Sequence, residues 1–510
     1  MSFDSVIKLI LIALLIFTPI AFGSVEIWAF SLMELGILLI IVLYVIQEFL
    51  IRNPQSAIRT PHSAFLLCFL FLALILFQMI PLPAEVVKVI SPKTYELRTQ
   101  LSNIPLPIAY SLLPVPSSLS PIASGLTPIP HSLFPLSFFP FATKIEFFKW
   151  FTLIGLFFFL LQWKLLANGQ RATKHLIIVI MLVGVIESFY GIFEFFSGHR
   201  YILYLEGSGW MSSVTGTFIN RNYFAGYLLM VIPLSVGFLF SRKANRRIHF
   251  QGWRHRLASL DGKALLLGFG VILMILGLLF SASRMGIISL LLSFSLISLL
   301  FRSHARGHKF SRTAVLIFGL AMLWAAWIGL DAVISRFFTT SEDFKMRWLF
   351  WVSTSQIIKD FPLFGSGLGT FAQIFPMYRS FPIRGFVTHA ENDFLQLVSD
   401  TGLIGIGILF ALFLFLFIKA ISKIYSLSAR DPGRYIAIGG LVGILALMFH
   451  SMVERNIQVP ANAFLFTFLW ALVLKITPSP HNSITRLLFL PIAYNLLPIT
   501  YSLSIIDSMT

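Results

Sequence analysis

Residues 264–301 read ALLLGFGVILMILGLLFSASRMGIISLLLSFSLISLLF, and this stretch decides the class of fold. Two apolar runs, 264–281 and 285–301, are separated by one short polar turn that contains Arg284. A helix that crosses a bilayer needs roughly 20 predominantly apolar residues. Each run is therefore predicted to span the membrane as a helix, and together they form a transmembrane hairpin.

The same pattern extends along the whole chain. Of the 510 residues, 57% are hydrophobic and only 12% are charged, whereas about a quarter of the residues in a soluble domain are charged. This composition excludes a soluble enzyme, a disordered scaffold and a nucleic-acid-binding protein. The expected fold class is all-α, a polytopic membrane protein of about twelve transmembrane helices. The predicted spans are 5–25, 28–50, 64–82, 146–163, 175–197, 223–241, 264–281, 285–301, 313–331, 397–418, 435–453 and 462–475.

The distribution of basic residues predicts the orientation. With a cytoplasmic N-terminus, Lys and Arg are about three times as dense in the inner loops as in the outer loops, as the positive-inside rule requires. This bias accounts for the net charge of +17 without a nucleic-acid partner. Both termini are therefore expected in the cytoplasm, and the bilayer is the expected partner of the apolar helices.

Two outer loops are long, and they differ in composition. The loop 83–145 is rich in proline, which blocks regular helix. The loop 332–396 contains an amphipathic segment near 346–360 and the glycine-rich sequence PLFGSGLGTF at 362–371. We interpret the glycines as a tight turn and not as a nucleotide-binding loop, because no strand precedes them.

Four regions are expected along the chain. They are N-terminal transmembrane helices at 1–175 with the Pro-rich loop 83–145, a core at 176–420 with the loop 332–396, C-terminal transmembrane helices at 421–476, and a low-complexity tail at 477–510.

Every unusual polar cluster lies on the outer side in this topology, which predicts one outward-facing site. Arg221, Arg284 and Arg347 are candidates to bind phosphate, because a guanidinium donates hydrogen bonds in a planar fork. Arg347 is equally compatible with a solvated position on a surface helix. The neighbours expected to support the site are Asn220, Asn222, Ser283 and Asn392.

His389 and Glu391 are candidates for a general base, since either group can accept a proton from a hydroxyl. Alternate residues do not share a helix face, so a metal site at 389–393 is not expected, and no cofactor is expected either. Asn392 and Asp393 have an alternative structural role as the cap of the following helix.

The motifs GTFINRNYFAGYL, SASRMG, PLFGSGLGTF and HAENDFLQLVSDTGLIG, in that order, resemble those of the O-antigen ligase family over roughly residues 180–417. The superfamily also includes O-antigen polymerases and protein O-oligosaccharyltransferases. The resemblance implies a multi-pass protein of the bacterial inner membrane whose site faces the periplasm. It implies a metal-independent, inverting transfer of a glycan from undecaprenyl diphosphate to an acceptor hydroxyl. That acceptor is a lipid A core sugar in ligases and a growing polysaccharide in polymerases.

The resemblance also assigns roles to individual positions. Arg221 and Arg284 match the diphosphate-binding arginines of the family. The position of the family's catalytic histidine, counted back from Gly402 and Gly405, is Glu391 in this chain. The register therefore favours Glu391 as the base, with His389 as the alternative.

Three other functions remain open at the level of sequence. The first is an O-antigen or exopolysaccharide polymerase, which shares the donor chemistry. The second is a transporter or flippase, since twelve spans are common in transporters, although no repeat relates the two halves of the chain. The third is a non-catalytic assembly subunit, because the histidine is replaced.

Overall fold

The structure is a computed structural model, and its description covers residues 2–51, 62–102, 133–168, 170–198, 201–206, 213–244, 262–302, 319, 340–383, 385–429 and 431–476. Within these ranges the chain is an all-α polytopic membrane protein, as predicted. Nine of the described helices are long and apolar enough to cross a bilayer. They are α1 (Phe3–Ile20), α2 (Ile27–Ile51), α8 (Pro140–Gln162), α10 (Gln170–Ser197), α11 (Arg221–Ala244), α13 (Gly262–Phe280), α14 (Arg284–Arg302), α19 (Asp393–Ser426) and α20 (Pro432–His450).

Two shorter apolar helices, α3 (His62–Met79) and α21 (Pro460–Lys475), complete the described bundle. Eleven of the twelve predicted spans therefore coincide with an apolar helix of the structure. The twelfth, 313–331, lies outside the described residues except for Gly319, and the tail 477–510 lies outside them entirely.

The remaining elements connect or flank these helices. They are η1 (Phe22–Ser24), β1 (Pro81–Pro83), α4 (Ala84–Ile90), α5 (Pro92–Ser102), β2 (Leu133–Pro135), α9 (Lys164–Asn168), β3 (Tyr201–Ile202), β4 (Leu205–Glu206), α17 (Thr340–Asp360) and α18 (Phe371–Tyr378). The strands form two small antiparallel ladders, β1 with β2 and β3 with β4. The ladder of β1 and β2 closes the two ends of the Pro-rich loop, whose residues 103–132 lie outside the described ranges.

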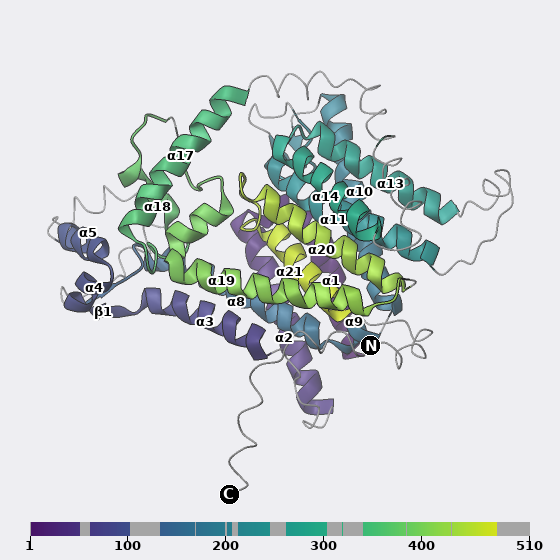
Figure 1. Cartoon of the computed structure of the whole chain (residues 1–510), viewed down its shortest axis with the longest axis horizontal. Helices are drawn as coiled ribbons and strands as arrows, with labels where there is room; N and C mark the ends of the chain where they lie inside the picture. The colour runs from purple at the N-terminus through teal and green to yellow at the C-terminus, as the bar shows by residue number, and fades with distance from the viewer. Residues whose placement is uncertain are drawn as a thin grey trace, which may run out of the picture.

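The antiparallel pair of α11 and α20 lies at the centre of the bundle (Figure 1). The transmembrane part of α11 is wholly buried. Gly443 of α20 allows the close approach, because a Cβ there would lie 2.8 Å from the backbone oxygen of Met230. Small residues one helical turn apart commonly bring membrane helices together in this way, and Gly439 precedes Gly443 by one turn.

This pairing places the beginning of α11 beside the end of α20. The helices α14 and α19 also begin there, as their contacts with the α20–α21 connection show. We call this end of the bundle the site end. The helices α17 and α18, drawn in green, lie beside it and outside the central helices (Figure 1).

The helix α19 is broken at Gly402, which has φ +66° and ψ −172°. Its free backbone groups pair with the glycine-rich segment: the Leu403 N–H donates to the Pro362 oxygen at 2.8 Å, and the Gly367 N–H donates to the Asp400 oxygen at 3.0 Å. Gly365, Gly367 and Gly369 all have positive φ angles. The predicted tight turn is confirmed. In the fold it supplies hydrogen-bond partners for the backbone groups that the break in α19 leaves unpaired.

Candidate functional site

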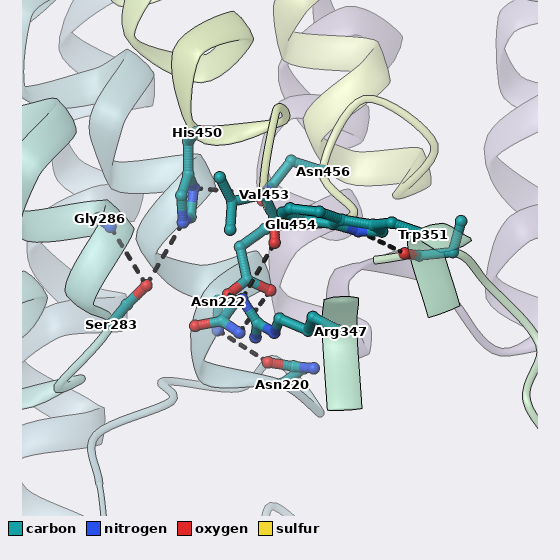
Figure 2. Close-up of polar contacts among 11 residues, drawn as sticks. Asn220, Asn222, Ser283, Gly286, Arg347, Trp351, His450, Val453, Glu454 and Asn456 are labelled. Atoms are coloured by element: carbon teal, nitrogen blue, oxygen red, sulfur yellow. Dashed lines mark hydrogen bonds and ion pairs between the residues drawn. The ribbon is translucent and has the colours of Figure 1, made fainter. Parts of the chain in front are cut away.

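The connection 451–459 between α20 and α21 organises the site, although its sequence was not among the predicted motifs. Its carboxylate, Glu454, is 4% exposed. An Arg347 Nη1 lies 2.5 Å from Glu454 Oε1, and the Asn222 side chain donates to Glu454 Oε2 at 2.7 Å. Figure 2 shows Arg347 and Asn222 converging on this carboxylate from opposite sides. The buried carboxylate thus ties α17 and α11 to the same connection.

Burial has a clear electrostatic consequence at Glu454. Loss of solvation raises the pKa of this carboxyl from 4.5 to about 7, and the positive charge of Arg347 opposes that rise. Arg347 also donates to the Val453 oxygen at 3.0 Å. Of the two alternatives for Arg347, the solvated position is therefore wrong, because its guanidinium contacts the α20–α21 connection.

His450, the last residue of α20, connects the start of α14 to the same connection (Figure 2). One ring nitrogen of this buried imidazole lies 3.3 Å from Ser283 Oγ, and the other lies 3.1 Å from Asn456 Nδ2. Ser283 in turn accepts from the Gly286 N–H at 3.3 Å, in the first turn of α14. This chain of contacts fixes the beginning of the helix that starts with Arg284.

The beginning of α19 is fixed in a similar way. The Asp393 carboxylate accepts from the backbone N–H groups of Asn456 and Ile457, at 2.7 Å each. Asn392 caps the helix by accepting from the Leu395 N–H at 3.0 Å. The capping interpretation of Asn392 is therefore confirmed.

Glu391 lies directly before this cap in an uncommon backbone conformation, with φ +52°. Such conformations in residues other than glycine are enriched at functional sites. Burial raises the pKa of the Glu391 carboxyl, while the positive charges of Arg347 and Arg455 lower it. At the residue before Glu391, the Ala390 oxygen accepts a hydrogen bond from Trp351 of α17 at 3.1 Å, and this contact holds the segment in place.

His389 has different surroundings. Its Nδ1 lies 3.4 Å from Gln396 Nε2, and Gln396 also donates to Gln458 Oε1 at 3.2 Å. Burial lowers the pKa of His389 well below its ordinary value, and the charges of Arg455 and Lys149 act in the same direction. A neutral imidazole is therefore expected at this position.

Arg221 and Arg284 are the first residues of α11 and α14, and both are half-buried. Each is followed by a helix whose N-terminus carries a partial positive charge, which favours an anion nearby. Asn220 supports the first of these helix starts by accepting from the Asn222 N–H at 2.8 Å. The geometry thus concentrates positive potential at two neighbouring helix starts.

Four residues of the connection region were missed by sequence reasoning: His450, Glu454, Arg455 and Asn456. A signal was present, because HSMVERN at 450–456 is strongly polar and lies between two apolar spans. Its position on the predicted outer side matches that of the other polar clusters. Among the residues that the structure describes, no group of three or more His, Cys, Asp or Glu side chains is placed to hold a metal ion.

A cavity of about 310 Å³ lies between α8, α19 and α21, and most of its lining is apolar. Its polar lining residues include Asp400 and the ion pair of Glu146 and Lys149, whose atoms lie 2.6 Å apart. Gln458 also lines the cavity. Because Gln458 accepts from Gln396, the cavity is connected to the His389 side of the site.

The fold and this charged cluster define a multi-pass membrane protein with a polar site at one end of its helical bundle. Residues 269–410 match the family model described as O-antigen ligase. The match supports membership of the O-antigen ligase superfamily, in agreement with the resemblance, and it indicates an enzyme of the glycosyltransferase or ligase type. A search of curated proteins found no match to the chain. The matched segment includes Arg284, Arg347 and Glu391, but it ends before the α20–α21 connection.

Proposed function

We propose that the chain transfers a glycan from undecaprenyl diphosphate to an acceptor hydroxyl, a lipid A core sugar, at the periplasmic face of the inner membrane. The observation that carries this proposal is the convergence of four separate polar segments on the α20–α21 connection. Arg221 and Arg284 stand next to Asn222 and Ser283, which contact Glu454 and His450, and Glu391 stands two residues before Asp393, which contacts Asn456. A transfer from a lipid diphosphate needs both kinds of group, the arginines and a base.

The arginines act on the leaving group. As the bond between the anomeric carbon and the diphosphate breaks, negative charge develops on the diphosphate oxygens. Preorganised cations near that charge stabilise the transition state. Arg221 and Arg284 are the proposed donors to the diphosphate, and Arg347 adds positive charge beside Glu391.

The base acts on the acceptor. In a single inverting displacement, the acceptor oxygen forms the new bond to the anomeric carbon while its proton passes to a nearby base. Glu391 is the proposed base, because its raised pKa brings the carboxyl closer to neutral pH, where general bases are most effective. His389 is the alternative base, and no metal ion takes part in the proposed step.

The cavity between α8, α19 and α21 is the proposed binding site of the carrier's hydrocarbon chain. Its lining is mostly apolar, and Gln458 connects it to the candidate site through Gln396. A mostly apolar lining matches a hydrocarbon chain, which has no hydrogen-bond donors or acceptors to satisfy. The hydrocarbon chain of the carrier would then lie in this cavity while its diphosphate lies at the neighbouring candidate site.

The proposal is tested with the full-length protein purified in detergent. Undecaprenyl-diphosphate-linked glycan and lipid A core are supplied with EDTA present, and glycan on the core is measured. Arg221→Ala and Arg284→Ala should each abolish product, whereas Arg379→Ala should not, because Arg379 is exposed at the end of α18. Full activity in both site variants would refute the assignment of the two arginines.

A second series separates the bases and the alternative functions. Loss of product in Glu391→Gln alone would identify Glu391, and loss in His389→Ala alone would identify His389. Long repeats formed on the carrier without added core would instead show a polymerase, which shares this donor chemistry. Substrate flux in proteoliposomes without covalent product would show a transporter.

A further inference from the structure

Arg455, in the α20–α21 connection, has an environment unlike that of the neighbouring Arg347. Its guanidinium carbon lies 5.8 Å from the centre of the Tyr223 ring, and its Nη1 donates to Tyr223 Oη at 3.4 Å. A cation held against an aromatic face is attracted by the ring. Tyr223 is itself 9% exposed and follows Asn222 at the start of α11, so the side chain of Arg455 is held against a fixed support.

The hydrogen-bonding capacity of Arg455 is not used up. Its Nε is buried, and no residue in the described part of the chain accepts a hydrogen bond from it. The same part of the chain offers it no carboxylate within ion-pair distance, whereas Arg347 has Glu454 at 2.5 Å. Buried donors are nearly always satisfied, so this N–H is available to an acceptor that the described part of the protein does not supply.

The position of this guanidinium relates it to the candidate bases. The positive charge of Arg455 acts on both His389 and Glu391. The guanidinium of Arg455 therefore lies near both candidate bases. A guanidinium has only donors to offer, and its positive charge favours an anion as the acceptor.

We propose that Arg455 binds a phosphate oxyanion of the lipid-linked donor, with Nε and one terminal nitrogen forming a two-pronged contact while Tyr223 holds the guanidinium in place. This inference rests on the proposed function and adds a residue outside the matched family segment. A planar fork suits a phosphate because both donors point in the same direction. Arg347 differs, because Glu454 already occupies its guanidinium.

Binding of farnesyl diphosphate to the purified full-length protein tests this assignment, measured by isothermal titration calorimetry with farnesol as the uncharged comparison. Arg455→Ala should weaken farnesyl diphosphate binding by about tenfold or more, since the loss of even one charge-assisted hydrogen bond has an effect of this size. Arg455→Lys should lie between Arg455→Ala and the wild type, because it keeps the charge but loses Nε. Arg379→Ala, which removes an exposed arginine, should bind like the wild type.

The outcomes distinguish the role of Arg455 from the proposed function. If the wild type prefers farnesyl diphosphate over farnesol and Arg455→Ala binds equally well, the role of Arg455 is refuted while the proposed function stands. If the wild type shows no preference for the diphosphate, the proposed function fails with it. Size-exclusion profiles check folding, and should Arg455→Ala not fold, wild-type affinity in Arg455→Lys would refute the two-pronged contact.

Inorganic diphosphate provides one more arm. It should compete with farnesyl diphosphate in the wild type, and Arg455→Ala should weaken that competition as well. If Arg455→Ala lowers the affinity for farnesyl diphosphate but not for inorganic diphosphate, Arg455 contacts the farnesyl chain. That result would refute the phosphate contact.

Discussion

Replacing Glu454 by glutamine is predicted to loosen the attachment of α17 to the bundle. The substitution removes the negative charge that Arg347 contacts, yet the amide oxygen can still accept from Asn222. Arg347 would then keep its positive charge beside the α20–α21 connection without a counter-charge. The chief effect should therefore be loss of the ion pair.

The magnitude follows from the burial of the two side chains. Breaking a fully buried pair by removing one partner costs about 3–5 kcal/mol, whereas an exposed pair contributes about 0–1 kcal/mol. The side chain of Glu454 is 5% exposed and that of Arg347 is 24% exposed, so this pair lies nearer the buried limit. We expect Glu454→Gln to lower the free energy of unfolding by about 2–3 kcal/mol. Glu454→Ala should lose about 1 kcal/mol more, because the hydrogen bond from Asn222 is lost as well.

A double-mutant cycle measures this coupling directly. Unfolding by SDS in mixed micelles, followed by tryptophan fluorescence, is compared for the wild type, Glu454→Gln, Arg347→Gln and the double variant. A coupling of about 1–3 kcal/mol is expected for two groups in direct contact. Glu96→Gln is the matched control, because Glu96 pairs with Lys93 at 3.0 Å on the exposed surface of α5 and should matter little. Purely additive effects of Glu454→Gln and Arg347→Gln would refute the reasoning.

Two further outcomes are expected. Gly402→Ala should destabilise the protein by about 1–3 kcal/mol or more, because only glycine readily adopts its backbone angles and a Cβ would overlap the Leu363 oxygen; unchanged SDS unfolding would show that the break in α19 is relaxed. Leu409→Trp should fill part of the cavity and weaken the binding of undecaprenyl diphosphate more than the binding of farnesyl diphosphate. An equal effect on the two affinities would show that the long hydrocarbon chain binds elsewhere.

The membrane-spanning helices were predictable because the signal for each one is local. A continuous apolar run must satisfy its own backbone hydrogen bonds in lipid, and a helix does this within the segment. The same locality made the Asn392 cap predictable, since the residue and its partner Leu395 are three positions apart. The turn at Gly365–Gly369 was predictable from its composition, but the break in α19 that it satisfies was not.

The site was predictable only in part. The sequence pointed to the segments that carry Arg221, Arg284 and Glu391. Charged side chains at a membrane boundary are energetically unfavourable unless they are paired or bind a ligand. The sequence did not single out Glu454, whose contact with Asn222 joins residues 232 positions apart. No local pattern specifies such a contact, because it depends on how α11 and α20 pack against each other.

The sequence by itself thus determined the all-α class and the positions of the helices, since the bilayer imposes length and hydropathy on each segment separately. The tertiary structure alone decided that four polar segments meet at the α20–α21 connection. It also decided that Arg347 is paired whereas the Nε of Arg455 has no acceptor among the described residues. The physical reason is that ion pairing and burial depend on distances between helices, and close packing such as that at Gly443 sets those distances.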